Sequence, residues 1–345
     1  MPANPLAAHP PWRQLLVLVV ALPVVVTAAI MAFAWPSGRL QPRDLPVGIV
    51  GATPATQQVV AGLAKARPDG FDFHLYASAA SARAAIHHRD VYGAIVMDPR
   101  GITVLEASAA SNTVAQLLTG VGDQVATSET RQAAAAGGTS AALRATIVDV
   151  VPSSKDDPRG AVMSSALLPL TICSIIIASA VAVLVAVKPA WRQLVALTSV
   201  AAVAGAGVYL IAQTWLGALP HQPWQSWGSI TLTMLAISSA TAGLCALIGT
   251  AGLALSAGLM VFVGNPFSGA TSAPELLPDA VHHLGQWLPP GAGANLLRSS
   301  AYFDGNGAAG PLTVILLWIA FGLGAVVVGH HTSPRFAAHP ERGDR

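Results

Sequence analysis

The sequence predicts a polytopic α-helical membrane protein that carries one α/β domain inserted on the outer side of the membrane. The chain has 345 residues, of which 53% are apolar and only 10% are charged, whereas soluble domains carry about 25% charged residues. Its mean hydropathy is +0.57. Of the 34 charged residues, 22 lie between Arg39 and Arg159. This composition excludes an ordinary cytosolic enzyme, and the net charge of +2 is too small to indicate nucleic-acid binding.

Six apolar stretches are candidates for membrane spans, a role that needs about 20 mostly apolar residues. We expect spans at about 15–35, 164–187, 194–215, 229–248, 253–266 and 311–328. The fifth of these is short for a full crossing. Tryptophan prefers the headgroup layer, and six tryptophans stand at span ends, namely Trp12, Trp35, Trp191, Trp215, Trp224 and Trp227. Trp318 is the exception, because it lies inside the last span.

The first span is followed by Ala32-Phe-Ala34, which resembles a signal-peptidase site. The apolar core of a signal sequence runs only about 7–15 residues, and this stretch is longer. We therefore expect a retained anchor.

The distribution of basic residues predicts the orientation, because Lys and Arg collect in cytoplasmic loops. With the N-terminus inside, only Arg298 of the short segments lies outside, and the cytoplasmic side holds Arg13, Lys188, Arg192, Arg335, Arg342 and Arg345. We predict a multi-pass plasma-membrane protein with both termini in the cytoplasm. Its expected parts are an N-terminal segment with the first span (1–36), an extracytoplasmic α/β domain (37–160), a five-helix membrane region (161–330) and a cytoplasmic tail (331–345).

The extracytoplasmic segment has the pattern of a small α/β fold with the order β-α-β-α-β-β-α-β. Strands are expected at about 45–50, 71–76, 91–97, 102–106 and 145–151 from short apolar or alternating runs. Thr53-Pro54 is a typical helix start, and an Ala-rich helix follows at 78–88. Asp98 to Gly101 predicts the turn of a hairpin. A long helix is expected at 111–136, interrupted near Gly120 and Gly122.

We find no catalytic constellation in the sequence and predict no metal site. His87 and His88 are adjacent and so point to different faces of a helix, which favours a solvated helix end over a metal cluster. Cys173 and Cys245 lie in apolar runs and are expected to be small packing residues. Nucleophile-elbow, Cys-x-x-Cys, His-Glu-x-x-His and P-loop motifs are all absent from the sequence.

The membrane region lacks the groups that ion-coupled transporters use. Residues 193–274 contain no Asp, Glu, Lys or Arg, whereas carriers usually place acidic or histidine relays at membrane depth. Uphill transport would therefore need energy from a separate ATPase. The basic loop Lys188-Pro-Ala-Trp-Arg192 is its obvious contact, through Lys188, Trp191 and Arg192. The same residues serve equally well as simple topology anchors.

Residues 264–310 are too apolar for a free external loop and too rich in proline and glycine to span the membrane. We expect two short helices, at about 275–287 and 291–303, that form a re-entrant hairpin (about 270–304) in the outer leaflet. Broken helices at membrane depth are tolerated when they are buried in protein or line a cavity. The hairpin is thus expected to bound the outer end of a pathway, or to be a purely structural plug. Glu275 and Arg298 are expected at helix ends, solvated by the interface.

This layout resembles the ABC-2 type transporter permeases, in particular their YhgE/Pip-like branch with a large extracytoplasmic insertion. The likeness is carried by Pro274-Glu-Leu-Leu-Pro278, Leu288-Pro-Pro-Gly291, Leu297-Arg298 and Tyr302-Phe-Asp-Gly305. It implies a membrane subunit, without its own ATPase site, that forms a homodimer or heterodimer in the lipid bilayer. A separate ABC ATPase subunit would bind the ATP and drive export. The resemblance assigns the coupling loop to Lys188–Arg192 and the extracellular re-entrant helices to Glu275–Phe303. Pro274, Glu275, Pro278, Pro289, Pro290, Arg298 and Tyr302 are the hairpin residues of interest.

Two further classes of function remain open at this point. A non-transporting envelope scaffold or receptor would use the charged extracytoplasmic domain to bind a partner. An enzyme acting within the membrane is the third class, and it lacks a catalytic constellation.

Overall fold

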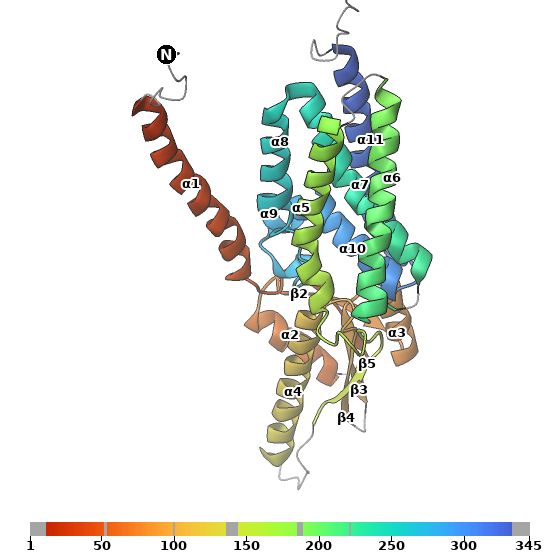
Figure 1. Cartoon of the computed structure of the whole chain (residues 1–345). Helices are drawn as coiled ribbons and strands as arrows, with labels where there is room; N and C mark the ends of the chain where they lie inside the picture. The colour runs from red at the N-terminus through yellow and green to blue at the C-terminus, as the bar shows by residue number, and fades with distance from the viewer. Residues whose placement is uncertain are drawn as a thin grey trace, which may run out of the picture.

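The computed structural model describes residues 12–51, 54–98, 101–135, 144–184, 189–220 and 222–332. A bundle of long apolar helices stands on an α/β domain, which caps one end of the bundle (Figure 1). The N-terminal end of the first helix and the C-terminal end of the last helix both lie at the opposite end of the bundle.

Five helices are long and apolar enough to cross a membrane. They are α1 (Trp12–Ser37), α5 (Ala161–Leu184), α6 (Ala190–Leu210) with its π-helical extension η1 (Ile211–Trp215), α7 (Pro223–Ile248) and α11 (Ala309–Thr332). These correspond to five of the six expected spans. The remaining stretch forms α8 (Thr250–Ala257) and the π-helix η2 (Gly258–Gly264), which together are shorter than a membrane crossing, as the length of the apolar run indicated.

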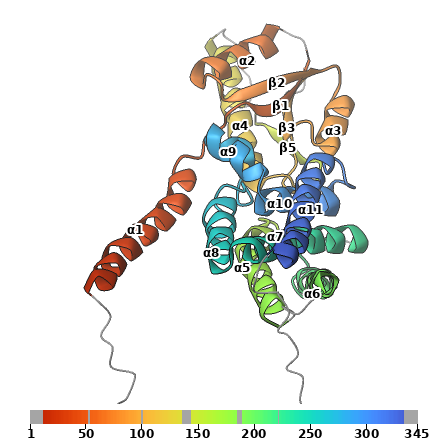
Figure 2. The same cartoon turned by 90° about the horizontal axis from the view of Figure 1, so that it is seen from above.

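Helix α7 is the centre of the bundle. It packs against α5, α6, α8, α10 (Pro289–Tyr302) and α11, which surround it when the molecule is viewed from above (Figure 2). Small residues allow the backbones to approach closely: a Cβ at Gly322 of α11 would overlap the backbone of Ser239, and one at Gly243 would lie 2.6 Å from the carbonyl oxygen of Gly322. Such contacts hold membrane helices together where no hydrophobic driving force acts between them.

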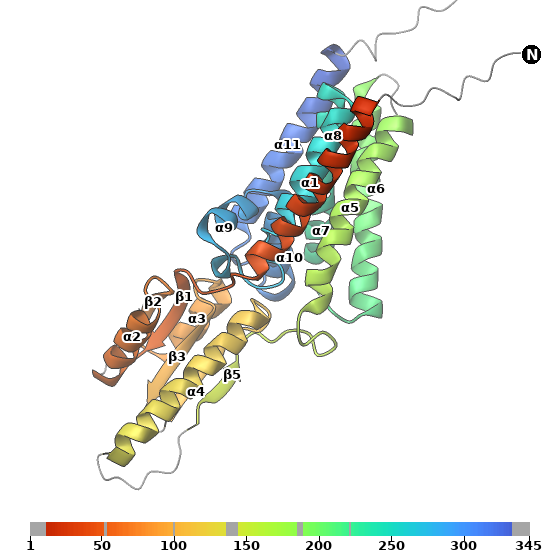
Figure 3. The ribbon, with the colours of Figure 1, turned by 90° about the vertical axis from the view of Figure 1, so that its left-hand side faces the viewer.

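Helix α1 stands apart from the other spans (Figures 1 and 2) and lies in front of the bundle when its side of the molecule faces the viewer (Figure 3). Its main contact with the bundle is with η2, and many of its large apolar side chains are exposed, including Leu22, Ile30 and Met31. An apolar helix of this length with exposed apolar side chains suits a surface that faces lipid.

The α/β domain contains one five-stranded sheet with the strand order β2-β1-β3-β4-β5. Its strands are β1 (Leu45–Val50), β2 (Phe71–Tyr76), β3 (Gly93–Asp98), β4 (Gly101–Glu106) and β5 (Thr146–Asp149). Only the β3–β4 pair is antiparallel; the other neighbouring strands run parallel. The predicted order of strands and helices is confirmed. Thr53 and residues 99–100, to which the helix start and the hairpin turn were assigned, lie outside the described residues.

The two faces of the sheet are covered by different helices. Helices α2 (Pro54–Ala66) and α4 (Asn112–Ala135) pack on one face, where Ile49, Val59 and Val125 share a core cluster. Helix α3 (Ala79–His88) packs on the other face through Ala82 and Ile86. Side chains alternate between the faces along each strand, which is why neighbouring residues of β1 belong to different clusters.

The expected interruption of the long helix near Gly120 and Gly122 is wrong. Helix α4 runs unbroken from Asn112 to Ala135. Gly122 is instead a site of close packing, because a Cβ there would overlap the side chain of Val104 on β4, whereas a Cβ at Gly120 would meet open space. Burial against the sheet outweighs the weak helix propensity of glycine, which costs about 1 kcal/mol per residue.

The two glycines form a matched pair for a stability test. We expect Gly122→Ala to lower the free energy of unfolding by about 1–3 kcal/mol, because the added methyl group overpacks the helix–sheet contact. Gly120→Ala should raise it by about 0.5–1 kcal/mol through better helix propensity. Urea unfolding of the full chain in neutral detergent, followed by circular dichroism, measures both. Equal stability of the two variants would contradict the assigned packing.

Candidate functional site

The candidate site lies where the α/β domain meets the segment between η2 and α11. This segment contains a short 3-10 helix, η3 (Pro274–Leu276), then α9 (Asp279–Gln286) and α10 (Pro289–Tyr302). Prolines begin two of these helices and precede the third: Pro274 begins η3, Pro278 is the N-cap of α9, and Pro289 and Pro290 begin α10. Proline suits the first helical turn, where its missing N–H costs nothing. The two predicted short helices are thus confirmed, and we call the α9–α10 segment the hairpin.

Residues at both ends of the hairpin are anchored in the core of the α/β domain. Leu276, just before α9, packs into a cluster of the sheet core that also contains Leu45, Val47, Val104, Val114 and Leu118. Phe303, just after α10, is 1% exposed and packs with residues of α3 and the sheet such as Ile86. The domain core is therefore completed by residues of the membrane region.

Backbone hydrogen bonds extend this anchor to the connection between α1 and β1. The N–H of Gln41 donates to the carbonyl oxygen of Leu276 at 3.0 Å, and the N–H of Arg43 donates to that of Glu275 at 3.0 Å. The guanidinium of Arg43 also donates to the Leu276 carbonyl oxygen at 2.9 Å. The start of the domain and the start of the hairpin are thus joined by hydrogen bonds.

Two guanidinium groups meet at one amide in the interface. Nη2 of Arg89 and Nη1 of Arg298 each donate to Oδ1 of Asn295, both at 3.2 Å. Asn295 in turn donates through Nδ2 to Oε1 of Gln286 at 2.6 Å, which ties α10 to α9. Arg89 also donates to the hydroxyl of Ser299 on α10. We call Arg89, Asn295 and Arg298 the arginine node.

The position of Arg89 follows from the end of α3. Arg89 is the C-cap residue of this helix and adopts the left-handed conformation, with φ of 64°. This conformation ends the helix, and the side chain stacks on the ring of Phe303, with its guanidinium carbon 5.3 Å from the ring centre. Burial is the main cause that lowers the pKa of Arg89, and the charges of Tyr92 and Glu275 oppose this shift.

Glu275 is held by Tyr92, which follows α3 on the same side of the domain. The phenol of Tyr92 donates to Oε2 of Glu275 at 2.7 Å. Burial, followed by the nearby carboxylate of Glu275, raises the pKa of Tyr92 well above its ordinary value. The phenol therefore stays protonated and remains a hydrogen-bond donor at physiological pH.

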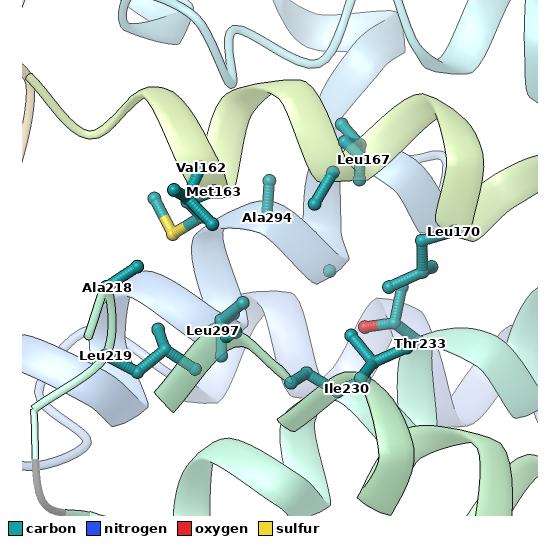
Figure 4. A pocket seen from close by; sticks show the side chains of 14 residues that line it. Val162, Met163, Leu167, Leu170, Ala218, Leu219, Ile230, Thr233, Ala294 and Leu297 are labelled. Carbon is teal, nitrogen blue, oxygen red and sulfur yellow. The ribbon is translucent and has the colours of Figure 1, made fainter. Parts of the chain in front are cut away.

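Several cavities flank α10. A junction pocket of about 630 Å³ is lined by groups from both parts of the molecule, among them Arg89, Tyr92, Glu275 and Asn295. An apolar pocket of about 580 Å³ lies inside the bundle and is walled by α5, α6 with η1, α7 and α10. Figure 4 shows the side chains of Met163, Leu167, Ile230 and Leu297 around this apolar pocket.

The expected solvation of Arg298 by the membrane interface is wrong. Arg298 lies within α10, not at its end, and is 3% exposed. Its hydrogen bonds go to Asn295 and to the carbonyl oxygen of Ala270, at 3.3 Å. Glu275 does stand in a first helical turn, but its partner is Tyr92. Protein groups, which a local sequence pattern does not reveal, replace the solvent.

The other hairpin residues singled out from the sequence have packing or capping roles. Pro274, Pro289 and Pro290 are buried, and the hydroxyl of Tyr302 donates to the carbonyl oxygen of Ala218 at 2.6 Å. The sequence analysis missed Arg89 and Asn295, since neither belongs to a motif. The exposed histidines His87 and His88 indicate the end of the helix, and this helix end determines the position of Arg89. They were the one feature of the sequence that could have pointed to Arg89.

The proposed coupling residues lie at the opposite end of the bundle. Trp191 and Arg192 are exposed in the first turn of α6, with the guanidinium carbon of Arg192 5.8 Å from the centre of the Trp191 ring. Lys188 and the basic residues of the C-terminal tail lie outside the described residues. The structure thus places Trp191 and Arg192 far from the hairpin and does not bring these two groups of residues together (Figure 1).

No metal cluster is formed in the described part of the chain, where no three His, Cys, Asp or Glu side chains are placed to hold an ion. His87 and His88 are exposed at the end of α3. Cys173 and Cys245 are free thiols. In comparisons with known proteins, no family model, no curated protein and no solved structure matches the chain. The functional argument therefore starts from the geometry described above.

The hydrogen bond between Tyr92 and Glu275 can be tested with a matched pair of phenol deletions. We expect Tyr92→Phe to lower the free energy of unfolding by about 1–3 kcal/mol, because Glu275 loses a donor to its charge. Tyr76→Phe is the control, since the Tyr76 hydroxyl has no hydrogen-bond partner in the described structure. Hydrogen exchange of residues 41–43 and 274–277 in the full chain should increase only in Tyr92→Phe. Indistinguishable exchange in the two variants would contradict the proposed anchor.

Proposed function

We propose that this protein is the permease subunit of an ATP-driven exporter of the ABC-2 type, which works with a separate ATPase subunit and is not itself an enzyme. The observation that carries the proposal is the hairpin. It is a pair of short helices that do not cross the membrane, it is buried against the bundle, and one of its helices forms a wall of the apolar pocket. Broken helices of this kind suit the rim of a transport pathway.

The composition of the spans supports a separate energy source. None of the five long apolar helices contains an Asp or Glu in its sequence. Buried hydroxyl groups are the main polar groups of α7, and most of them donate to carbonyl oxygens of their own helix, as Thr233 does to Ser229 at 2.8 Å. A path without acidic relays has no group with which to couple substrate movement to protons.

In this proposal α8 and η2 form a sixth, shortened crossing. Their 15 residues span about 22 Å at 1.5 Å per residue, and the hairpin occupies the remaining depth on the side of the α/β domain. The chain then crosses six times, which agrees with two helix ends at the same end of the bundle (Figure 1). The α/β domain would be extracytoplasmic, and both termini would be cytoplasmic in the plasma membrane.

The ATPase would dock at the end of the bundle opposite the α/β domain. Trp191 and Arg192 are exposed there, next to the basic loop that contains Lys188. Work from ATP hydrolysis would reach the hairpin along α5, α6 and α7, which are packed together. Two permease copies, identical or homologous, would form the membrane part of the exporter. Each copy would contribute one hairpin.

A scaffold or receptor is the second candidate function, and one observation favours it. Strand β2 is an edge strand whose Leu75 side chain is 72% exposed. An open edge of this kind can accept a strand from another protein. The two functions differ in their dependence on ATP: a scaffold binds its partner equally well with or without a functional ATPase.

Charge reversal tests the coupling loop. We expect Lys188→Glu combined with Arg192→Glu to abolish copurification with the ATPase encoded nearest to this chain and the ATPase stimulation by this chain, because the acidic loop repels the docking surface. The control reverses two exposed charges on the α/β domain, Lys65→Glu with Arg67→Glu, and should leave both measurements unchanged. Accessibility labelling of both termini checks that the topology is kept. Full stimulation by the loop variant in its normal topology would remove the loop from the mechanism, and absence of any stimulating ATPase would refute the permease.

A further inference from the structure

A third pocket, which is polar, adjoins the apolar pocket at Met163. It lies between the α/β domain, the start of α5 and α10, and five serines are among the residues that line it, namely Ser108, Ser111, Ser153, Ser164 and Ser272. We call it the serine-rich pocket. Met163 lines both pockets. The two cavities also divide neighbouring residues of α10 between them, since Leu297 lines the apolar pocket and Arg298 the serine-rich pocket.

Arg298, one of the residues that line this pocket, has a buried hydrogen-bond donor without a partner. The side chain is 3% exposed, and two of its nitrogens donate to Asn295 and Ala270. Its Nε–H is buried and has no partner. Leaving a buried charged donor unsatisfied is costly, which makes Arg298 a candidate to bind an acceptor group.

The positive charge of Arg298 is not neutralised by an acid. Among the residues that the structure describes, the only ion pair joins His74 to Asp72 on β2. Two nearby carboxylates are engaged elsewhere. Glu275 accepts from Tyr92, and Asp157 accepts from the N–H groups of Ala161 and Val162, at 2.8 and 2.9 Å, at the start of α5. Arg89 adds a second cation at the shared amide, so the node carries an excess of positive charge.

Arg159 places a further cation on the rim of the serine-rich pocket. Its side chain is exposed, two residues before α5 begins at Ala161. A buried guanidinium and an exposed guanidinium are groups that bind phosphate and carboxylate in proteins. No carboxylate side chain lines this pocket in the described structure.

We propose that the two pockets together bind one anionic amphiphile, with its phosphate or carboxylate group in the serine-rich pocket at Arg298 and Arg159 and its apolar chain in the pocket beyond Met163. A polar, cationic cavity and an apolar cavity that share the lining residue Met163 match the two halves of such a molecule. A free anion would leave the apolar pocket unused, and a neutral apolar ligand would leave Arg298 unpaired. The proposal concerns binding by this chain alone and needs neither an ATPase nor transport.

Native mass spectrometry of the full chain in a neutral detergent tests the proposal. The probes are lysophosphatidylglycerol, lysophosphatidylcholine with the same single acyl chain, and inorganic phosphate. We expect saturable, one-to-one binding of the anionic lysolipid and at least about tenfold weaker binding of the zwitterionic one, because the latter offers no net negative charge to Arg298. Inorganic phosphate alone should not compete.

Three substitutions assign the binding to the two pockets. Arg298→Gln should weaken binding of the anionic lysolipid at least about tenfold, and Arg298→Lys should retain part of the affinity. Arg159→Gln, on the exposed rim, gives the same direction of change if Arg298→Gln does not fold. Ala166→Phe fills the apolar pocket and should abolish binding, whereas Ser165→Phe on the exposed face of the same helix should not.

Each alternative outcome overturns the proposal. Equal binding of the two lysolipids would show that only the apolar chain is recognised. Competition by inorganic phosphate, with binding unaffected by Ala166→Phe, would show a site for free anions. Binding that survives both Arg159→Gln and Ala166→Phe would place the lysolipid elsewhere on the protein. Because no nucleotide is present, none of these results depends on the permease assignment.

Discussion

The burial of Arg298 is the constraint on which the junction depends. A guanidinium keeps its charge at any physiological pH, so a helix that buries one must surround it with acceptors. The acceptors are Asn295 from the same helix and the carbonyl oxygen of Ala270 from the preceding loop. Asn295 also accepts a hydrogen bond from Arg89 of the α/β domain. Three separate parts of the chain are thus fixed relative to one another by one amide oxygen and its neighbours. The α/β domain and the hairpin consequently form one unit, which the shared packing of Leu276 and Phe303 reinforces.

The rest of the membrane region is organised on a different principle. Around α7, glycine, alanine and serine bring backbones close together, and buried hydroxyls bond within their own helix. This packing is dense and uncharged, so the charged groups gather at the two ends of the bundle. One end holds the arginine node and its cavities, and the other holds Trp191 and Arg192. The division explains why both proposals concern the ends of the helices and neither concerns their middles.

Much of this arrangement could be read from local sequence. Strand and helix order in the α/β domain follows from alternation and helix starts, and the hairpin follows from its prolines, because these signals act over a few residues. Tertiary contacts explain the failures. Gly122 by itself predicts a helix break, because the sequence does not show that Val104 packs against it. Arg298 by itself predicts a helix end, because the sequence does not show that Asn295 and Ala270 accept its hydrogen bonds in place of water. Arg89 lies about 200 residues away from its partners in α10, so no local pattern could have joined them.

The short connection from α1 to β1 has a mechanical consequence. Seven residues, 38–44, separate the helix from the strand, and the hydrogen bonds of Gln41 and Arg43 clamp this connection to Glu275 and Leu276. Helix α1 contacts the bundle mainly at η2 and is therefore connected to the start of the hairpin through these hydrogen bonds. A change in the tilt of α1 would therefore act directly on the start of the hairpin. Membrane thickness or a neighbouring protein would set this tilt, and its effect would reach the hairpin without transmission through the helical bundle.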